Sequence, residues 1–170
     1  MAIQLPRVLK NLNLFVDGRG YAGRVDEITL PKLTVKTEEH RAGGMDAPVR
    51  LDMGMEAFEA TLMLAELDEA VFATFGLLGR DAIPVTVRGA IQAQGGEAQA
   101  VVVNLRGGWQ ELDPGTWKVG DRNGLTVKMA CSYYKLAIAD RDLVEIDIPN
   151  LVRLIDGKDQ LEGQRTALGL

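Results

Sequence analysis

The sequence is poor in the residues that build metal centres and cysteine-based active sites. It contains one cysteine, Cys131, and one histidine, His40. A single cysteine excludes an intrachain disulfide, and one residue of each type excludes zinc sites made from several cysteines and histidines. Cys131 alternates with Val127 and Met129, so we expect a small buried side chain rather than a nucleophile paired with His40. We therefore expect no metal, no cofactor and no catalytic residue, and interpret His40 as a solvated or interface side chain.

Positive charge, aromatic residues and long apolar runs are also scarce. The 19 lysines and arginines stand against 24 acidic residues, which gives a net charge of −5 and a pI near 5.0. Tight binding to nucleic acid needs basic residues that neutralise phosphates, and stacking of single strands needs aromatics interleaved with them. The chain also lacks the apolar run of a signal peptide or a membrane span. We expect a protein that is soluble when made, is assembled in the cytoplasm, does not insert into membranes and does not hold DNA tightly.

The composition is that of one β-rich globular domain. The chain has 170 residues, of which 46% are hydrophobic and 25% charged. A domain of this size buries roughly 70% of the surface that its unfolded chain exposes. The 19 glycines against 6 prolines are typical of a chain with many turns. We therefore expect residues 1–170 to form a single, mainly β domain.

Alternation of apolar and polar residues predicts the first strands. One strand covers residues 11–16 and ends in a turn at Asp17-Gly18, and residues 21–30 are expected to pair with it. Residues 57–64 alternate again, which predicts a strand with one buried face. A single helix is expected to follow, because residues 67–75 are apolar at helical spacing and acidic in the first turn.

The clearest hairpin joins residues 83–94 to residues 97–106 around Gly95-Gly96. This dipeptide suits a tight two-residue turn. One face of each arm is apolar and the other polar, which predicts a sheet with one face toward a core and one toward water. We expect Gly107-Gly108 to end the hairpin.

The C-terminal part is predicted to contain a long strand and a short helix. The strand covers residues 125–138 and turns through residues 139–142 into a last strand at residues 143–148. Residues 159–168 could form a helix, although Gly163 inside it costs roughly 1 kcal/mol relative to alanine.

The most informative stretch is the long connection at about residues 38–54. It is too long for a hairpin turn, and loops of this length are usually functional or disordered. Disordered segments are poor in apolar residues, whereas this connection is not. Its apolar residues are Met45, Val49, Leu51 and Met53, with Met55 just beyond. We therefore expect this connection to lie against a surface, and that surface to belong to another copy of the protein.

Few patterns suggest an enzyme. A glycosidase needs two carboxyl groups at a fixed separation across a cleft, whereas neighbouring surface carboxylates are common. The acidic groups in question are Glu38 with Glu39, and Asp142 with Glu145 and Asp147. Ala42-Gly43-Gly44 lacks the lysine and the serine or threonine of a phosphate-binding loop, and no helix pattern follows it. We interpret its glycines as allowing an unusual turn or a close backbone contact.

Seven segments of the sequence occur in a characteristic order. They are LNLFVDG, TLPKL, KTEEHRAGGMDAPV, DMGMEAFEA, ELDPGTWK, CSYYKL and EIDIPN. Together they resemble the major tail tube proteins of contractile-tailed bacteriophages, a family that includes P2-type tube proteins and the tube subunits of R-type pyocins. The turn at residues 139–142 departs from the family pattern because it lacks the glycine expected there.

The resemblance implies a fold and an assembly. The fold would be a β-sandwich or curled antiparallel sheet with one flanking helix. Six copies would form a ring with an inner β-barrel, and the rings would stack helically into a hollow conduit for DNA inside a contractile sheath. The implied partners are other copies of the chain, the sheath protein, baseplate or tail-tip and terminator proteins, and in the lumen the tape measure protein and passing DNA. The implied location is the virion tail.

Within that reading, the long connection is expected to contact stacked rings and neighbouring subunits. The residues assigned to this contact are His40, Arg41, Gly43, Gly44, Met45, Asp46, Arg50, Asp52, Met53 and Met55. A second set is expected at the lumen or its rim. That set is Gln92, Gln94, Glu97 and Gln99.

Several alternatives stay open on the sequence. The chain could form the tube of an R-type bacteriocin or of a type VI-like injection system. It could instead be a β-barrel carrier of small molecules, which would be monomeric and bury an apolar pocket. A carboxylate hydrolase would lose activity when Glu145 or Asp147 is replaced. The connection could also simply cover the sheet of its own subunit.

Overall fold

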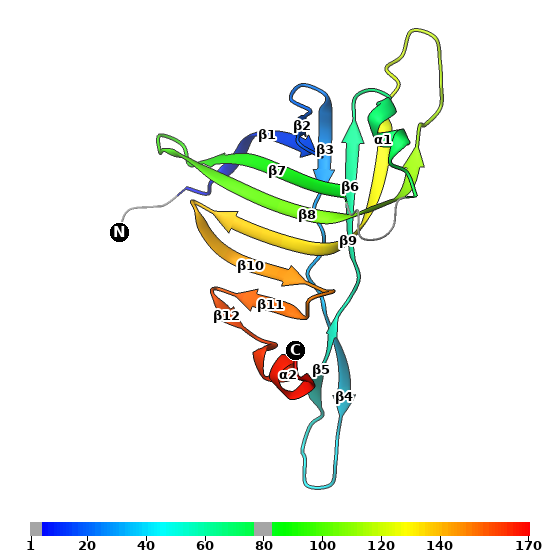
Figure 1. Cartoon of the computed structure of the whole chain (residues 1–170). Helices are drawn as coiled ribbons and strands as arrows, with labels where there is room; N and C mark the ends of the chain where they lie inside the picture. Colours follow the sequence, from blue (N-terminus) through cyan, green and yellow to red (C-terminus); the bar gives the residue numbers. More distant parts are fainter. Residues whose placement is uncertain (1–4, 77–82) are drawn as a thin grey trace.

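The computed structural model describes residues 5–76 and 83–170 (Figure 1). The expectation that the N-terminus holds no signal peptide falls partly on residues 1–4, which lie outside the described residues. No helix within the described ranges is long and apolar enough to cross a membrane. The elements are β1 (Val8–Val16), β2 (Arg19–Gly20), β3 (Val25–Thr29), β4 (Val35–His40), β5 (Val49–Met55), β6 (Phe58–Leu64), α1 (Glu69–Ala73), β7 (Ile83–Gln92), β8 (Ala98–Asp113), β9 (Leu125–Ile138), β10 (Arg141–Asp147), β11 (Val152–Ile155), β12 (Lys158–Asp159) and α2 (Glu162–Leu168).

One antiparallel sheet forms the body of the molecule. Its main path runs β12-β11-β10-β9-β8-β7-β1-β2, and β6 pairs with both β9 and β3. Strand β9 contacts β8 along one edge, while its other edge is shared, β6 pairing with residues 125–131 and β10 with residues 133–138. Because one edge of β9 serves two strands, the sheet divides and curls, and Figure 1 shows β3 and β6 crossing the direction of β7 and β8. The predicted curled antiparallel sheet is confirmed.

The core lies between the curled parts of the sheet. The predicted alternation over residues 57–64 is confirmed, because Phe58, Ala60, Leu62 and Leu64 are all buried. The side chain of Trp109 is fully buried, and its Nε1 donates a hydrogen bond to Thr74 Oγ1 at 2.9 Å. Tryptophan buried in this way needs a partner for its N–H. This contact fixes the end of α1 against β8.

The predicted helix is confirmed in a shorter form, as α1. The carboxylate of Asp68 accepts hydrogen bonds from the backbone N–H groups of Ala70 and Val71 and so caps the helix. Helix α2 begins at Glu162, three residues after the predicted start, and lies beside strands β11 and β12, which the sequence pattern did not predict.

Gly107 does not end a strand, contrary to the prediction. Strand β8 continues to Asp113, with a register shift between Arg106 and Gly107. A Cβ atom at Gly107 would lie 1.9 Å from the carbonyl oxygen of Ala130 on β9. The glycine therefore permits close approach of two strands at a bulge, which lets the long strand bend over the core.

The N-terminal pairing also differs from the prediction. Residues 21–30 are predicted to pair with β1, but β3 pairs with β6 instead, and β1 pairs with β7 and with Arg19 and Gly20 of β2. Sequence neighbours commonly pair, but the segment after Tyr21 turns away to join a strand that is distant in sequence. The turn between β9 and β10 forms without glycine, since Ala139 and Asp140 take φ values of 50° and 60°, which suit a tight two-residue hairpin turn.

Candidate assembly surface

The predicted long loop is largely a β-hairpin, and this is a correction. Strands β4 and β5 pair from Val35 and Met55 to His40 and Val49, so only residues 41–48 form the turn (Figure 1). The sequence pattern missed the strands because most of their side chains are exposed on both faces. Without a buried face, a strand shows no alternation of burial. The β4–β5 hairpin extends from the sheet as an arm.

One face of the β4–β5 hairpin, its apolar face, carries an apolar row from β5, and β4 places His40 opposite Val49 and Glu38 opposite Leu51 on the same side. Alternation along β5 places Val49, Leu51 and Met53 together, with exposed fractions of 44%, 45% and 53%. The opposite face carries Arg50, paired with Glu39 at 3.7 Å, and Asp52. Exposed apolar side chains that line up on one side of an arm indicate an interaction surface.

Hydrogen bonds among residues of the hairpin turn fix the conformation of that turn. The Nε of Arg41 donates to the carbonyl oxygen of Met45 at 3.3 Å, and the backbone N–H of Met45 donates to the carbonyl oxygen of Ala42 at 3.2 Å. Gly43, Gly44 and Asp46 lie in the same turn, and His40 is exposed at the end of β4. These predicted contact residues therefore form an ordered tip.

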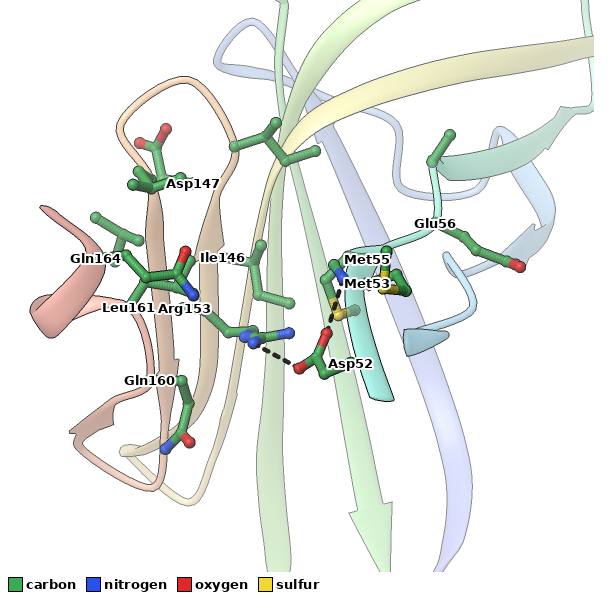
Figure 2. A pocket seen from close by; sticks show the side chains of 15 residues that line it. Asp52, Met53, Met55, Glu56, Ile146, Asp147, Arg153, Gln160, Leu161 and Gln164 are labelled. Carbon is green, nitrogen blue, oxygen red and sulfur yellow. Dashed lines mark hydrogen bonds and ion pairs between the residues drawn. The ribbon is translucent and has the colours of Figure 1, made fainter. Parts of the chain in front are cut away.

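At its base the hairpin is tied to the C-terminal part of the chain. The Nη2 of Arg153, on β11, lies 2.9 Å from Oδ2 of Asp52, whose Oδ1 accepts the Gly54 N–H at 2.8 Å (Figure 2). The Gly54 N–H, followed by Arg153, holds the pKa of the Asp52 carboxyl below its ordinary value. The side chain of Arg153 is only 13% exposed. Its buried Nε has no hydrogen-bond partner among the described residues.

A cleft of about 890 Å³ lies at this base, between the hairpin and the C-terminal strands (Figure 2). Its apolar lining includes Met53, Met55, Ile148, Leu151 and Leu161. Met55 is only partly exposed and packs against the core. Of the predicted contact residues, Asp52, Met53 and Met55 line this cleft. Val49 and Leu51, which are not in that set, stand on the free part of the arm.

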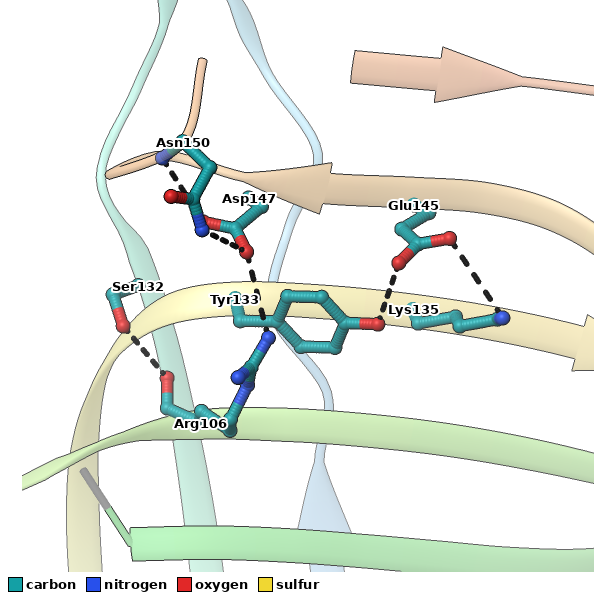
Figure 3. A network of polar contacts seen from close by, with 7 residues as sticks. All are labelled: Arg106, Ser132, Tyr133, Lys135, Glu145, Asp147 and Asn150. Carbon is teal, nitrogen blue, oxygen red and sulfur yellow. Dashed lines mark hydrogen bonds and ion pairs between the residues drawn. The ribbon is translucent and has the colours of Figure 1, made fainter. Parts of the chain in front are cut away.

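A second surface covers the polar face of strands β7 to β10. The guanidinium of Arg106 lies 4.0 Å from the ring centre of Tyr133 and 3.4 Å from the Asp147 carboxylate (Figure 3). Lys135 pairs with Asp142 at 2.8 Å and with Glu145 at 3.7 Å. Both cations are therefore paired with carboxylates of β10, across β9 in the case of Arg106 and on the adjacent strand in the case of Lys135.

The polar face continues beyond these ion pairs. Tyr133 donates its hydroxyl to Glu145 at 2.8 Å, and burial, followed by this carboxylate, raises the pKa of Tyr133 to about 12. On the next strands, Thr86 Oγ1 donates to Asn104 Oδ1 at 2.9 Å, while Arg88 makes no ion pair within the described ranges. This face is polar and close to neutral.

The predicted lumen or rim residues lie at one end of this face. Gln92 ends β7 and donates to the carbonyl oxygen of Gly96 at 2.7 Å, and Gln99 accepts a hydrogen bond from Arg7. Gln94 and Glu97 lie in the turn between β7 and β8. The structure thus places all four residues around the tip of one hairpin rather than along the sheet.

Sequence reasoning missed several residues of these surfaces. Arg153 reaches Asp52 across 101 positions in the chain, and no local pattern signals such a contact. Trp117 and Val119 lie in the loop between β8 and β9 and are exposed by 66% and 103%. Their position in a glycine-rich loop could have marked them, because apolar residues in an exposed loop need a partner.

Comparison with known proteins places the chain in a family. The family model described as "Phage tail tube protein FII" matches residues 6–169. The tail tube protein of Escherichia phage P2 is 35% identical over 171 residues, which covers 98% of this chain and 99% of that protein. The major tail tube protein of Serratia phage KSP20 is 34% identical, with 91% of each chain covered.

Solved structures share the fold at low sequence identity. The PVC sheath/tube terminator of an extracellular contractile injection system, in its extended state, superimposes with a TM-score of 0.62 at 11% identity, covering 80% of this chain and 99% of that one. A chain of the PVC sheath-tube complex gives a TM-score of 0.60, also at 11% identity, with 78% and 91% covered. The family match over nearly the whole sequence, together with this fold, shows that the chain belongs to the phage tail tube protein FII family.

Proposed function

We propose that this tail tube protein assembles, from identical copies, into hexameric rings that stack helically into a hollow conduit for DNA within a contractile sheath. As a member of the tail tube family it is a structural component of the virion tail. The observation that carries the proposal is the β4–β5 hairpin, an ordered arm on which Val49, Leu51 and Met53 remain about half exposed. Another copy of the chain would cover the apolar side chains of this arm.

Ring closure is supported by the edges of the sheet. Strand β2 pairs only with Phe15 and Val16, and the Tyr21 N–H donates to the carbonyl oxygen of Leu14, so residues 8–13 of β1 have no strand beside this edge among the described residues. At the other end of the sheet, the path finishes with the two residues of β12. Open edges favour pairing with further strands, and closing a sheet on itself removes them. Pairing between neighbouring subunits would join the sheets into an inner β-barrel.

Stacking of rings is assigned to the hairpin. A contact that joins two different surfaces of identical subunits generates a filament when it does not close. The apolar face formed by Val49, Leu51 and Met53, with the ordered tip around Arg41 and Met45, would cross the boundary between rings. There it would contact a subunit of the adjacent ring.

The polar face of β7 to β10 is assigned to the lumen. Arg106 and Lys135 are both engaged by carboxylates, so neither is free to hold a phosphate, and Arg88 is a single cation of β7 without an ion pair among the described residues. A wall of this type would let DNA pass without tight binding, since retention depends on basic groups that release counterions. The tape measure protein would occupy the same lumen before DNA passes, and Gln94 and Glu97 would lie near its rim.

The remaining partners follow from the position of a tube in a tail. The sheath protein would surround the tube, and the terminator and the baseplate or tail-tip proteins would bind its ends. Assembly would take place in the cytoplasm of the host bacterium. We assign no catalytic activity, because the carboxylates considered for hydrolysis are engaged by Arg106, Lys135 and Tyr133 in a structural network.

The second candidate belongs to the same mechanical class. The fold is shared with a sheath/tube terminator and with a chain of a sheath-tube complex of an extracellular contractile injection system, and a bacteriocin or type VI-like tube would use the same ring and stack. The phage role is favoured because the curated relatives at 35% and 34% identity are phage tail tube proteins. A monomeric small-molecule carrier would not need the exposed arm.

Electron microscopy of variants in the hairpin tests the proposal. The double variant Val49→Thr and Leu51→Thr keeps residues that favour strands but removes the apolar face, and is expected to abolish tubes while leaving the folded subunit intact. The matched control is Glu39→Gln, which breaks one exposed ion pair on the polar face and costs at most about 1 kcal/mol. Normal tubes from the double variant would overturn the assignment of the hairpin.

A further inference from the structure

The subunit has an apolar knob at the end opposite to its cleft. The knob is the loop of residues 114–124 between β8 and β9, and Figure 1 shows it projecting from the molecule far from the β4–β5 hairpin and α2. Trp117 and Val119 on this loop are 66% and 103% exposed. Two large apolar side chains held in water on a projecting loop indicate a binding element rather than a core element.

The cleft beside the hairpin base is unfilled in the single subunit. Its volume of about 890 Å³ lies within the range of pockets that bind ligands, about 300–1,000 Å³. Apolar side chains line it, and the buried Nε of Arg153 at its wall has no acceptor among the described residues. A buried donor without an acceptor is unfavourable. We therefore expect the cleft to bind a group that is largely apolar and that has an oxygen to accept a hydrogen bond from Arg153 Nε.

The charges of the two surfaces are complementary. The cleft lining contains three acids and one cation, namely Asp52, Glu56, Asp147 and Arg153. The knob carries two cations and one acid: Lys118, which pairs with Asp121 at 3.5 Å, and Arg122, which pairs with Asp26 outside the knob at 3.1 Å. Both of these pairs are exposed, so they can exchange partners at an interface. Lys118 stands between Trp117 and Val119, so a cation would arrive at the acidic rim together with the apolar side chains. Complementary charge of this kind favours the correct partner over others.

We propose that the knob of one subunit inserts into the cleft of a second copy in the adjacent ring. Trp117 and Val119 contact the apolar lining, and a backbone carbonyl of the loop accepts the hydrogen bond from Arg153 Nε. The two surfaces lie at opposite ends of the subunit, so the contact is heterologous and continues from copy to copy. This inference rests on the proposed function, and it names a stacking contact distinct from the apolar face of the hairpin.

Disulfide trapping tests the contact in assembled tubes. The double variant Val119→Cys and Gln164→Cys places one thiol on the knob and one at the cleft. These positions lie at opposite ends of one subunit, so they are too far apart for an internal disulfide. Oxidised tubes are expected to give a ladder of covalent multimers on a non-reducing gel. The control pairs Val119→Cys with Gln94→Cys, at the tip of the β7–β8 hairpin, and is expected to give no ladder.

The outcomes separate this contact from the proposed function. Tubes that form normally from the Val119→Cys and Gln164→Cys variant but give no ladder overturn the knob contact and leave the tube function standing. Failure of the unmodified protein to form tubes overturns the proposed function and this contact with it. In a second measurement, Trp117→Ala is expected to raise the concentration needed for assembly about tenfold or more, as loss of an interface anchor does. Lys118→Ala should change it less than about twofold, since exposed ion pairs contribute little. Equal effects of the two substitutions overturn the contact.

Discussion

Asp52 of β5 and Arg153 of β11 form an ion pair at 2.9 Å that ties the base of the β4–β5 hairpin to the C-terminal strands, although 101 positions separate them in the chain. Asp52 is also held by the Gly54 N–H, and Gly54 adopts a positive φ of 95° at the irregular end of the strand pair. The orientation of the arm therefore depends on a contact between distant parts of the sequence.

The first prediction concerns the pKa of Asp52. Its pKa is lowered first by the Gly54 N–H and then by Arg153, which acts through both a hydrogen bond and its charge. In the variant Arg153→Met the pKa of Asp52 is expected to rise part of the way toward the ordinary value of about 3.9, because the Gly54 N–H remains. An NMR titration measures this, with Asp52→Asn identifying the signal. An unchanged pKa would show that the ion pair is absent in solution.

The sign of the pH dependence follows from the same pKa. A carboxyl group whose pKa is lower in the folded state contributes stability above its unfolded pKa of about 4 and loses it as the pH falls through the folded value. The difference in stability between the unmodified protein and Asp52→Asn is therefore expected at neutral pH and should disappear in strong acid. A difference that is constant from neutral pH to strong acid would contradict this.

The second prediction concerns close packing at Gly107. A Cβ atom there would lie 1.9 Å from a backbone oxygen of β9, so Gly107→Ala is expected to lower the free energy of unfolding by about 3 kcal/mol or more. Urea denaturation of the unassembled subunit measures the change. The matched control is Gly163→Ala in α2, where nothing lies within 4 Å and the change should raise stability by up to about 1 kcal/mol. Similar effects of both changes would refute the bulge.

The third prediction concerns the reactivity of Cys131. Burial raises the pKa of its thiol to about 12, and only the thiolate reacts readily with disulfide reagents. In the folded protein at pH 8 we expect labelling to proceed only as fast as the core opens, and to become rapid in denaturant. Stopped-flow labelling follows this directly. Rapid labelling of the native protein would place Cys131 outside the core.

The fourth prediction concerns the charge of the lumen wall. The triple variant Asp142→Asn, Glu145→Gln and Asp147→Asn removes the partners of Arg106 and Lys135. Tubes of this variant are expected to retain double-stranded DNA at low salt and to release it as salt rises, because freed cations bind phosphates with counterion release. Co-sedimentation of DNA with tubes over a salt series measures the effect.

A matched control distinguishes the effect of removing carboxylates from the polar face from the effect of changing the net charge of the tube. The variant Glu27→Gln, Glu59→Gln and Glu162→Gln removes the same number of carboxylates from exposed positions on β3, β6 and α2. Its tubes should retain no more DNA than the unmodified tubes. Equal retention by both variants would show that the polar face of β7 to β10 does not line the lumen.

The sequence predicted the elements that bury one face. Residues 57–64 alternate because one side of β6 meets the core, and the hairpin of β7 and β8 is marked by Gly95-Gly96 and by the same alternation. The buried character of Cys131 followed from its place in that pattern. These features are local, so a window of a few residues contains the information that determines them.

The features that were missed depend on distant parts of the chain or lack burial. Strands β4 and β5 are exposed on both faces, so charged residues such as Glu38 and Glu39 interrupt any alternation. Gly107 looked like a strand end because the contact that requires it, with Ala130, lies on another strand. Strand β3 pairs with β6 rather than with β1, and this pairing also depends on a strand that is distant in the sequence. Where a local pattern fits two strand pairings equally well, contacts with distant parts of the chain decide which pairing forms.

The most direct test of the central claim is a cryo-electron microscopy reconstruction of the purified chain at high concentration. We predict hollow tubes of stacked hexameric rings in which the β4–β5 hairpin crosses from one ring to the next and Arg106 and Lys135 face the channel. A protein that remains a monomer at high concentration, or tubes in which this polar face points outward, would contradict the claim.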